Sequence, residues 1–147
     1  MSVVSILEWL ATVSAAIFAG GALYISIVEH PARLNAGVTV ALAHFRQMYR
    51  LAAPWQASAA ALSLVCGVLA AILSAEWAWA IGGVMVGLAI PFTLLAMMPI
   101  NRQLLDRVPP REDSARTLLM WWGQRHWVRS ILGAIGLVIL VWAAVHR

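Results

Sequence analysis

The 147-residue chain has no lysine and one cysteine, and only 11% of its residues are charged. So few charges cannot coat a water-soluble domain, whose surface is typically about 25–35% charged. Its hydrophobic content is 63% and its mean hydropathy is +0.85, whereas soluble domains contain roughly 45–50% apolar residues. We therefore expect lipid, and not water, to surround much of the folded chain.

The scarce polar chemistry excludes several other classes of protein. The single cysteine, Cys66, lies in an apolar run, so it forms neither an intrachain disulfide nor a cysteine metal cluster. All ten basic residues are arginines scattered between apolar stretches, which disfavours nucleic acid as a partner. Residues 1–7 carry no Lys or Arg, so we expect the first apolar segment to be retained and not cleaved as a signal peptide.

Four apolar stretches are candidates for membrane spans. Residues 10–28, 51–75 and 77–100 contain no Asp, Glu, Arg or His, and Glu76 lies between the last two. The fourth stretch, 130–145, is shorter. A spanning helix needs about 20 apolar residues. The sequence therefore predicts an all-α integral membrane four-helix bundle, a single transmembrane domain over 1–147 with spans at about 8–29, 51–75, 77–100 and 126–146.

The arginines predict how the chain is oriented. The connection after the first span contains Arg33, Arg46 and Arg50, and the one after the third contains Arg102, Arg107, Arg111, Arg116 and Arg125. The opposite side of the membrane would have Arg147 alone. By the positive-inside rule, both long connections are cytoplasmic, so both termini lie outside the cell inner membrane. The tryptophans fit two interfacial belts, an outer one with Trp9, Trp77, Trp79 and Trp142 and an inner one with Trp55, Trp121, Trp122 and Trp127.

The connections also carry helical patterns. Apolar residues recur at helical spacing between the first two spans (Val38, Leu42, Phe45, Tyr49, Ala52), which predicts an amphipathic helix on the inner membrane surface. No helix breaker interrupts the run from Glu112 to the glycine at 123, so the fourth helix should begin in the cytoplasm. Small residues every four positions in the second span, with Gly83 and Gly87 in the third, predict close helix packing. Pro91 should kink the third helix.

Polar side chains gather at the cytoplasmic ends of the spans. They are Glu29, His30 and Arg33 after the first span, Asn101 and Arg102 after the third, and Arg125, His126 and Arg129 at the fourth. Such groups are costly near lipid unless they face a bundle interior or a watery cavity. On the fourth helix, His126 and Arg129 share one seam with Trp122 and Gly133, which favours an inward orientation. The alternatives are an interfacial hydrogen bond for His126, lipid phosphate for Arg129, and an intrahelical ion pair for Glu29 and Arg33.

Three motifs resemble the anthrone-oxygenase-like family of small four-span membrane proteins. They are Val28-Glu29-His30-Pro31-Ala32-Arg33, Asn101-Arg102-x-Leu104 and Trp122-x3-His126-Trp127-Val128-Arg129. The resemblance implies a four-helix bundle and, from fungal members, oxygenation of an anthrone to an anthraquinone without an obvious cofactor. The positions that match the family motifs are His30, Asn101, Arg102, Trp122, His126 and Arg129.

This chemistry would begin with removal of an acidic methylene proton, after which the carbanion reacts with oxygen directly. A neutral histidine suits that base role, so we predict His126 as the base and His30 as the second choice. Arg129 and Asn101 would stabilise the enolate oxygen, and Trp122 would stack on the flat substrate. Glu29, Arg33 and Arg102 are further candidates for substrate binding.

Two other functions fit the same residues. The first is a non-enzymatic membrane protein that binds lipid, quinone or a hydrophobic partner through its arginines. The second is a haem- or metal-binding bundle with His30 and His126 as axial ligands, although no metal-binding motif is present. The sequence does not require a cofactor. We expect membrane lipid and a hydrophobic small molecule as partners, and homo-oligomerisation stays open. A transporter is disfavoured because no charge lies at mid-depth in the spans.

Overall fold

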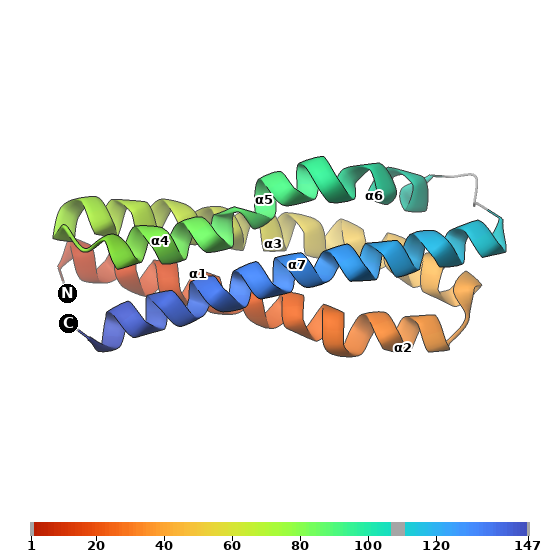
Figure 1. The fold of residues 1–147 in the computed structure, drawn as a ribbon, viewed down its shortest axis with the longest axis horizontal. Coiled ribbons are helices and arrows are strands. Elements are labelled where there is room, and N and C mark those ends of the chain that lie inside the picture. The colour runs from red at the N-terminus through yellow and green to blue at the C-terminus, as the bar shows by residue number, and fades with distance from the viewer. Residues whose placement is uncertain (1, 107–110, 147) are drawn as a thin grey trace.

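The computed structural model describes residues 2–106 and 111–146, and throughout that part of the chain every regular element is helical (Figure 1). The first rod joins α1 (Val3–Tyr24), the π-helical turn η1 (Ile25–Glu29) and α2 (His30–Asn35). The second is α3 (Val38–Ser74), and the fourth is α7 (Glu112–Val145). The third joins α4 (Trp77–Gly87), α5 (Ala89–Phe92), the π-helical turn η2 (Thr93–Met97) and α6 (Met98–Leu105). All four rods are long and apolar enough to cross a membrane, which confirms the predicted all-α fold.

The four rods form an elongated bundle with both termini at one end (Figure 1). α1 packs against α3 and α7, and α4 packs against the same two helices. α7 also begins at Glu112, as predicted. Its 34 residues extend for about 51 Å at 1.5 Å per residue, which exceeds the roughly 30 Å hydrocarbon core of a bilayer. The rods therefore continue beyond the membrane at one or both ends, and the positions of the predicted span boundaries on them stay predictions.

The predicted surface helix between the first two spans is not confirmed as a separate element. α3 runs without a break from Val38 to Ser74 and includes Pro54, so the presumed surface segment forms its first turns. The apolar side of those turns is buried: Ala41 and Phe45 are 0% exposed and belong to one core cluster with Leu104 and Leu119. The apolar face of these first turns of α3 therefore packs against α6 and α7, whereas the sequence predicted that it would contact lipid.

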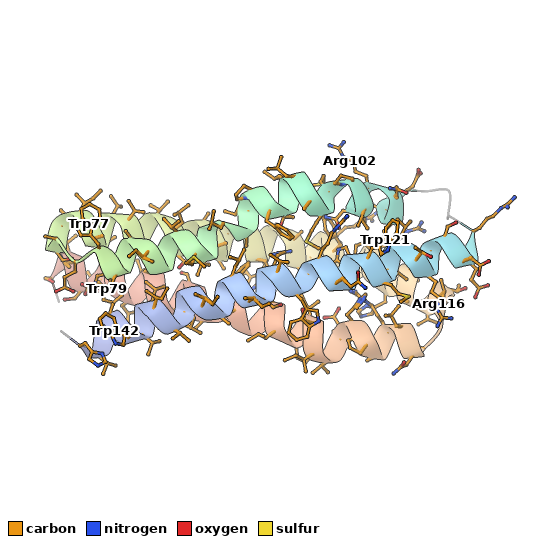
Figure 2. All side chains as sticks on the ribbon, viewed as in Figure 1. Trp77, Trp79, Arg102, Arg116, Trp121 and Trp142 are labelled. Carbon is orange, nitrogen blue, oxygen red and sulfur yellow. The ribbon has the colours of Figure 1, made fainter. Side chains whose placement is uncertain are left out.

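The close packing that the small residues predicted is confirmed between α3 and α4. A Cβ atom at Gly67 would lie 2.6 Å from the Trp79 carbonyl oxygen and 3.2 Å from the Gly83 Cα. Trp79 itself is 1% exposed, so it belongs to the core and not to the interfacial belt in which the sequence placed it. Trp77 and Trp142 lie exposed at the same end of the bundle (Figure 2).

Prolines shape the first and third rods. α4 ends at Gly87, four residues before Pro91, which has no N–H to donate to the Gly87 carbonyl. Figure 1 shows the resulting sideways offset between α4 and α5. Both π-helical turns also end two residues before a proline, η1 before Pro31 and η2 before Pro99. A wider turn lets the chain accommodate a proline without ending the rod.

Gly67→Ala should destabilise the bundle because its methyl group would collide with backbone atoms of α4. We expect a loss of about 1–3 kcal/mol, measured as a lower thermal unfolding temperature in detergent. The control is Gly20→Ala in α1, where an added Cβ meets no atom within 4 Å. Equal unfolding temperatures for the two variants would show that the α3–α4 contact is not as tight as described.

Candidate functional site

Polar side chains from three of the rods meet inside the bundle where the prolines bend it. Ser26 and His30 come from η1 and α2, Asn101 from α6, and His126 from α7. His126 and Asn101 are each 1% exposed, and Arg33 is 4% exposed. Polar groups buried so deeply need partners within the protein, so their contacts define the site.

The indole of Trp122 is the centre of this cluster. Its Nε1–H donates a 2.9 Å hydrogen bond to Asn101 Oδ1. One side of the ring system stacks on His126, with ring centroids 4.6 Å apart and planes inclined by 25°. The Arg33 guanidinium carbon lies 4.8 Å from the centre of the same ring system. Trp122 therefore connects residues of α2, α6 and α7.

His30 and Arg33 form a unit behind Trp122. Arg33 Nε and one of its terminal nitrogens lie 3.0 Å and 2.8 Å from His30 Nδ1. Because a guanidinium only donates, Nδ1 of His30 is an acceptor. Arg33 also lies 3.6 Å from Glu29 Oε1, which confirms the intrahelical ion pair anticipated for these two residues. The other imidazole nitrogen of His30 lies where any side chain at Gly123 would collide with it, so that glycine makes room for the ring.

The hydrogen bonds around His126 are consistent with a neutral ring that carries its proton on Nδ1. Ser130 Oγ lies within hydrogen-bond distance of the Ala22 carbonyl at 2.9 Å, of Ser26 Oγ at 2.8 Å and of the His126 carbonyl at 3.4 Å. We assign its single proton to the Ala22 carbonyl. In the 2.8 Å bond between the two serines, Ser26 must then be the donor. Ser26 has no second proton, so the 2.9 Å bond between Ser26 Oγ and His126 Nδ1 requires that Nδ1–H donate. In the neutral ring, Nε2 is left as the proton acceptor.

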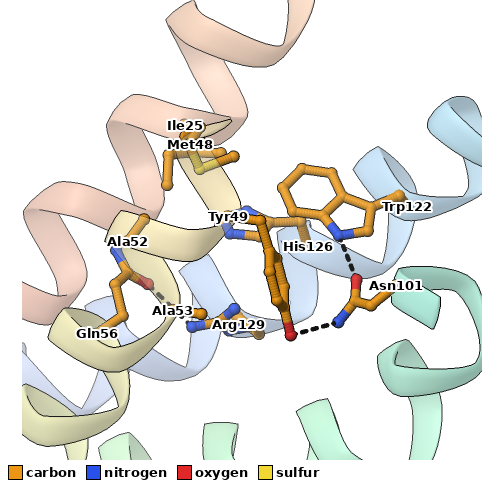
Figure 3. A pocket seen from close by; sticks show the side chains of 10 residues that line it. All are labelled: Ile25, Met48, Tyr49, Ala52, Ala53, Gln56, Asn101, Trp122, His126 and Arg129. Carbon is orange, nitrogen blue, oxygen red and sulfur yellow. Dashed lines mark hydrogen bonds between the residues drawn. The ribbon is translucent and has the colours of Figure 1, made fainter. Parts of the chain in front are cut away.

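His126 lines a small cavity of about 20 Å³ together with residues of α3, α6 and α7 (Figure 3). That volume is enough for about one water molecule. Asn101 Nδ2 donates a 3.2 Å hydrogen bond to the Tyr49 hydroxyl oxygen at its edge. Tyr49 accepts that bond, so its own proton is available to a molecule in the cavity.

Arg129 lies at the other edge of the cavity. One of its terminal nitrogens donates a 2.9 Å hydrogen bond to Gln56 Oε1, and its guanidinium carbon lies 5.5 Å from the Phe18 ring centre. Its Nε is buried without a hydrogen-bond partner. The ion pairs among the described residues join Glu29 to Arg33 and to His44, and none of them includes Arg129. Arg129 therefore brings an uncompensated positive charge to the cavity.

The structure brings most of the predicted site residues together. Asn101, Trp122, His126 and Arg129 line the cavity, whereas His30 and Arg33 lie behind Trp122. Glu29 is half-buried and lines a separate open depression with His44. Arg102 is exposed and points away from the bundle (Figure 2). Two further arginines of the charge pattern, Arg107 and Arg147, lie outside the described residues.

Four residues of the site were missed by the sequence reasoning. Ser26 and Ser130 each lie four positions from a predicted histidine, His30 and His126, and that spacing on one helical face was the available signal. Tyr49 was assigned to the face of a surface helix, because its place inside the bundle depends on α3 being continuous. Gln56 lies seven residues after Tyr49 on α3, which puts it two turns along the same face.

The cavity beside His126 does not bring the two imidazoles together as ligands for a haem. His126 lines the cavity, but His30 does not, and the indole of Trp122 packs against both rings. Within residues 2–106 and 111–146, no three His, Cys, Asp or Glu side chains gather as ligands for a metal ion. The donor sets of this site are therefore imidazole, hydroxyl, amide and guanidinium groups.

Fold and site together define a four-span helical membrane protein with a buried imidazole and a guanidinium on one internal cavity. A family model described as anthrone oxygenase matches residues 45–139, which is more than half of the chain. The protein belongs to the anthrone oxygenase family, as the resemblance of its motifs predicted. The matched segment includes Tyr49, Asn101, Trp122, His126 and Arg129 and leaves His30 outside it. No curated protein and no solved structure matches the chain.

Arg33→Ala should destabilise the protein much more than Arg102→Ala. The first substitution empties the space beside Trp122 and removes the arginine paired with Glu29, which we expect to cost about 3 kcal/mol. The second removes an exposed side chain and should leave the unfolding temperature unchanged. Thermal unfolding in detergent compares the two, and a similar loss in both variants would contradict the described position of Arg33.

Proposed function

We propose that this protein is an oxygenase that needs no cofactor and converts the activated methylene of a hydrophobic, anthrone-like ketone to a carbonyl group. The observation that carries the proposal is the Ser130–Ser26–His126 chain of hydrogen bonds. It supports a neutral His126 with Nε2 free to accept a proton beside a cavity. Membership of the anthrone oxygenase family supports the same class of substrate.

The first step is transfer of a methylene proton from the substrate to His126 Nε2, which leaves an enolate. A base held in place typically contributes about 10²–10⁴-fold to such a step. Ser26 orients the ring and accepts its Nδ1 proton in a hydrogen bond. Stacking against Trp122 restricts the ring further, so little reorganisation is needed when the proton moves.

The negative charge that develops on the ketone oxygen has two donors available. Arg129 supplies a guanidinium, and Tyr49 supplies a hydroxyl proton that its bond from Asn101 leaves unused. Such donors stabilise an enolate most strongly where water is excluded. Asn101, predicted as a direct donor, uses its oxygen for Trp122 and its amide nitrogen for Tyr49. In this proposal it is a positioning residue that acts through Tyr49.

Molecular oxygen is the oxidant and balances the reaction. The enolate carbon adds O₂ and becomes a peroxide anion, which takes a proton and forms a hydroperoxide. Removal of the remaining hydrogen on that carbon breaks the O–O bond, forms the carbonyl and releases hydroxide, which becomes water. One methylene and one O₂ thus give one ketone and one water, so no external reductant is consumed. His126 serves as the base in both deprotonations.

The reaction would take place near the inner face of the membrane. His126 and Arg129 lie near the middle of α7, whereas Ile25 and Asn101 of the cavity lie nearer the ends of their rods opposite the termini. The exposed residues Arg102 and Arg116 lie toward that same end of the bundle (Figure 2). By the positive-inside rule that end faces the cytoplasm of a cell inner membrane, with both termini outside.

His126→Gln should abolish oxygenation of anthrone because glutamine cannot accept the methylene proton. Oxygen uptake and the absorbance of the anthraquinone product, measured on purified protein in detergent, give the rate. His146→Ala is the matched control, since His146 is exposed at the terminal end of α7. If the His126→Gln variant has the unfolding temperature of the wild type and also its turnover rate, His126 is not the base.

Ser26→Ala should lower kcat by up to about 100-fold with little change in KM, because the histidine loses the group that orients it. Ser26→Thr keeps a hydroxyl at this position and should restore most of the rate. The split between kcat and KM separates a positioning role from a binding role. Equal rates for the alanine and threonine variants would mean that the hydroxyl does not position His126.

The orientation is tested by labelling of single cysteines with a membrane-impermeant thiol reagent in intact cells. We expect a cysteine introduced at Ser2 to react from outside and one introduced at Arg111 to react only after the cells are broken. Both positions are exposed, and the native Cys66 is buried. The reverse pattern would place the cavity at the outer face.

A further inference from the structure

We infer that the body of the substrate binds in a groove between α3 and the kinked third rod, which it enters sideways from the bilayer with its oxygen directed at Arg129. This inference rests on the proposed function, because it names where that substrate binds and how it arrives. The groove has a volume of about 160 Å³ and is lined by residues of α3, α5, η2 and α6.

Size separates the groove from the cavity beside His126. The cavity holds about 20 Å³, which is room for about one water molecule and not for a fused-ring ketone. The groove is about eight times larger, and the two linings share Tyr49, Ala53, Gln56 and Arg129. A substrate whose body fills the groove can therefore place only its reacting edge beside His126.

The position of the groove indicates access from lipid. Its outer rim includes Leu94, which is 57% exposed, and the exposed residue Ala57. Apart from Tyr49, Gln56, Thr93 and Arg129, its lining is apolar. These rim residues belong to rods long enough to cross a membrane, so acyl chains would surround the opening. The offset at Pro91 moves α5 out of line with α4 (Figure 1), and α5 supplies part of the groove wall.

Charge complementarity selects the occupant. Arg129 borders an apolar groove with a buried Nε that has no hydrogen-bond partner and with no carboxylate paired to it among the described residues. A flat aromatic ketone supplies both an apolar body and an oxygen that becomes negative on enolisation. Such a ligand would satisfy the guanidinium, and it would gain most of this stabilisation only as the charge develops.

Gln56 lines both the groove and the cavity. Its Oε1 accepts a hydrogen bond from Arg129, and its Nε2 lies against Gly21, where a Cβ would approach within 2.6 Å. The ketone oxygen can replace Gln56 Oε1 as the acceptor for Arg129. The amide side chain would then move aside and open the route to His126, so substrate binding and opening of the cavity are one event.

The test compares Ala57→Phe, which fills the groove, with Ser58→Phe, its neighbour on α3, which is exposed and does not line the groove. Both proteins are reconstituted in phosphatidylcholine nanodiscs, and binding of 1-hydroxyanthraquinone is followed by its absorbance. We expect Ala57→Phe to weaken binding about tenfold or more and to raise KM for anthrone, whereas Ser58→Phe leaves both unchanged. Leu94→Trp, which fills the same groove from the opposite wall, provides a second variant if Ala57→Phe unfolds.

Equal binding by the two phenylalanine variants and by Leu94→Trp would overturn the inference. It would also be overturned if nanodiscs containing phosphatidylglycerol abolished probe binding, because the groove would then hold a lipid headgroup. Failure of the proposed function has a different signature, in which no anthrone is oxidised although the probe binds and Ala57→Phe weakens it. If anthrone is oxidised equally by wild type and by both groove variants, the function stands and the groove is not its binding site.

Discussion

The absence of water inside a bilayer is the constraint on which the rest of this structure depends. A polar group placed there has to find its partner within the protein, and the few polar side chains of this chain do so around one indole. Trp122 contacts Arg33, His126 and Asn101 through three kinds of interaction: a cation over the ring, a stacked imidazole and a hydrogen bond. The same contacts hold three of the four rods in register at this depth.

The prolines determine where the rods bend around these polar contacts. Pro31 and Pro99 each follow a π-helical turn, and the second residue after each is a buried polar side chain that contacts Trp122: Arg33 and Asn101. The first and third rods therefore share one local geometry, in which a π-helical turn is followed by a proline and then by a buried polar residue. Pro91, which has no such counterpart in this pattern, offsets the third rod and helps to form the groove beside Arg129.

The buried charges divide into a compensated and an uncompensated one. Arg33 is paired with Glu29, bonded to His30 and covered by an aromatic ring, so its charge is used for structure. Arg129 has one amide partner and an unpartnered Nε at a cavity edge, which is a costly arrangement unless a ligand completes it. Under the proposed function that asymmetry is useful, because an unsatisfied donor would stabilise charge that appears only during the reaction.

The amino-acid sequence by itself determined that the chain is a four-span helical bundle of the anthrone oxygenase family, because long apolar runs and short motifs are local features. It also placed Trp122 and His126 on one inward seam, since helical spacing alone decides which residues share a face. Only the tertiary structure decided that Arg102 points away, that Tyr49 and Gln56 line the cavity, and that Ser26 hydrogen-bonds both His126 and Ser130. Those outcomes depend on how the separate rods are rotated and joined. The first turns of α3 continue into the second span, and the local spacing of residues does not predict that continuity.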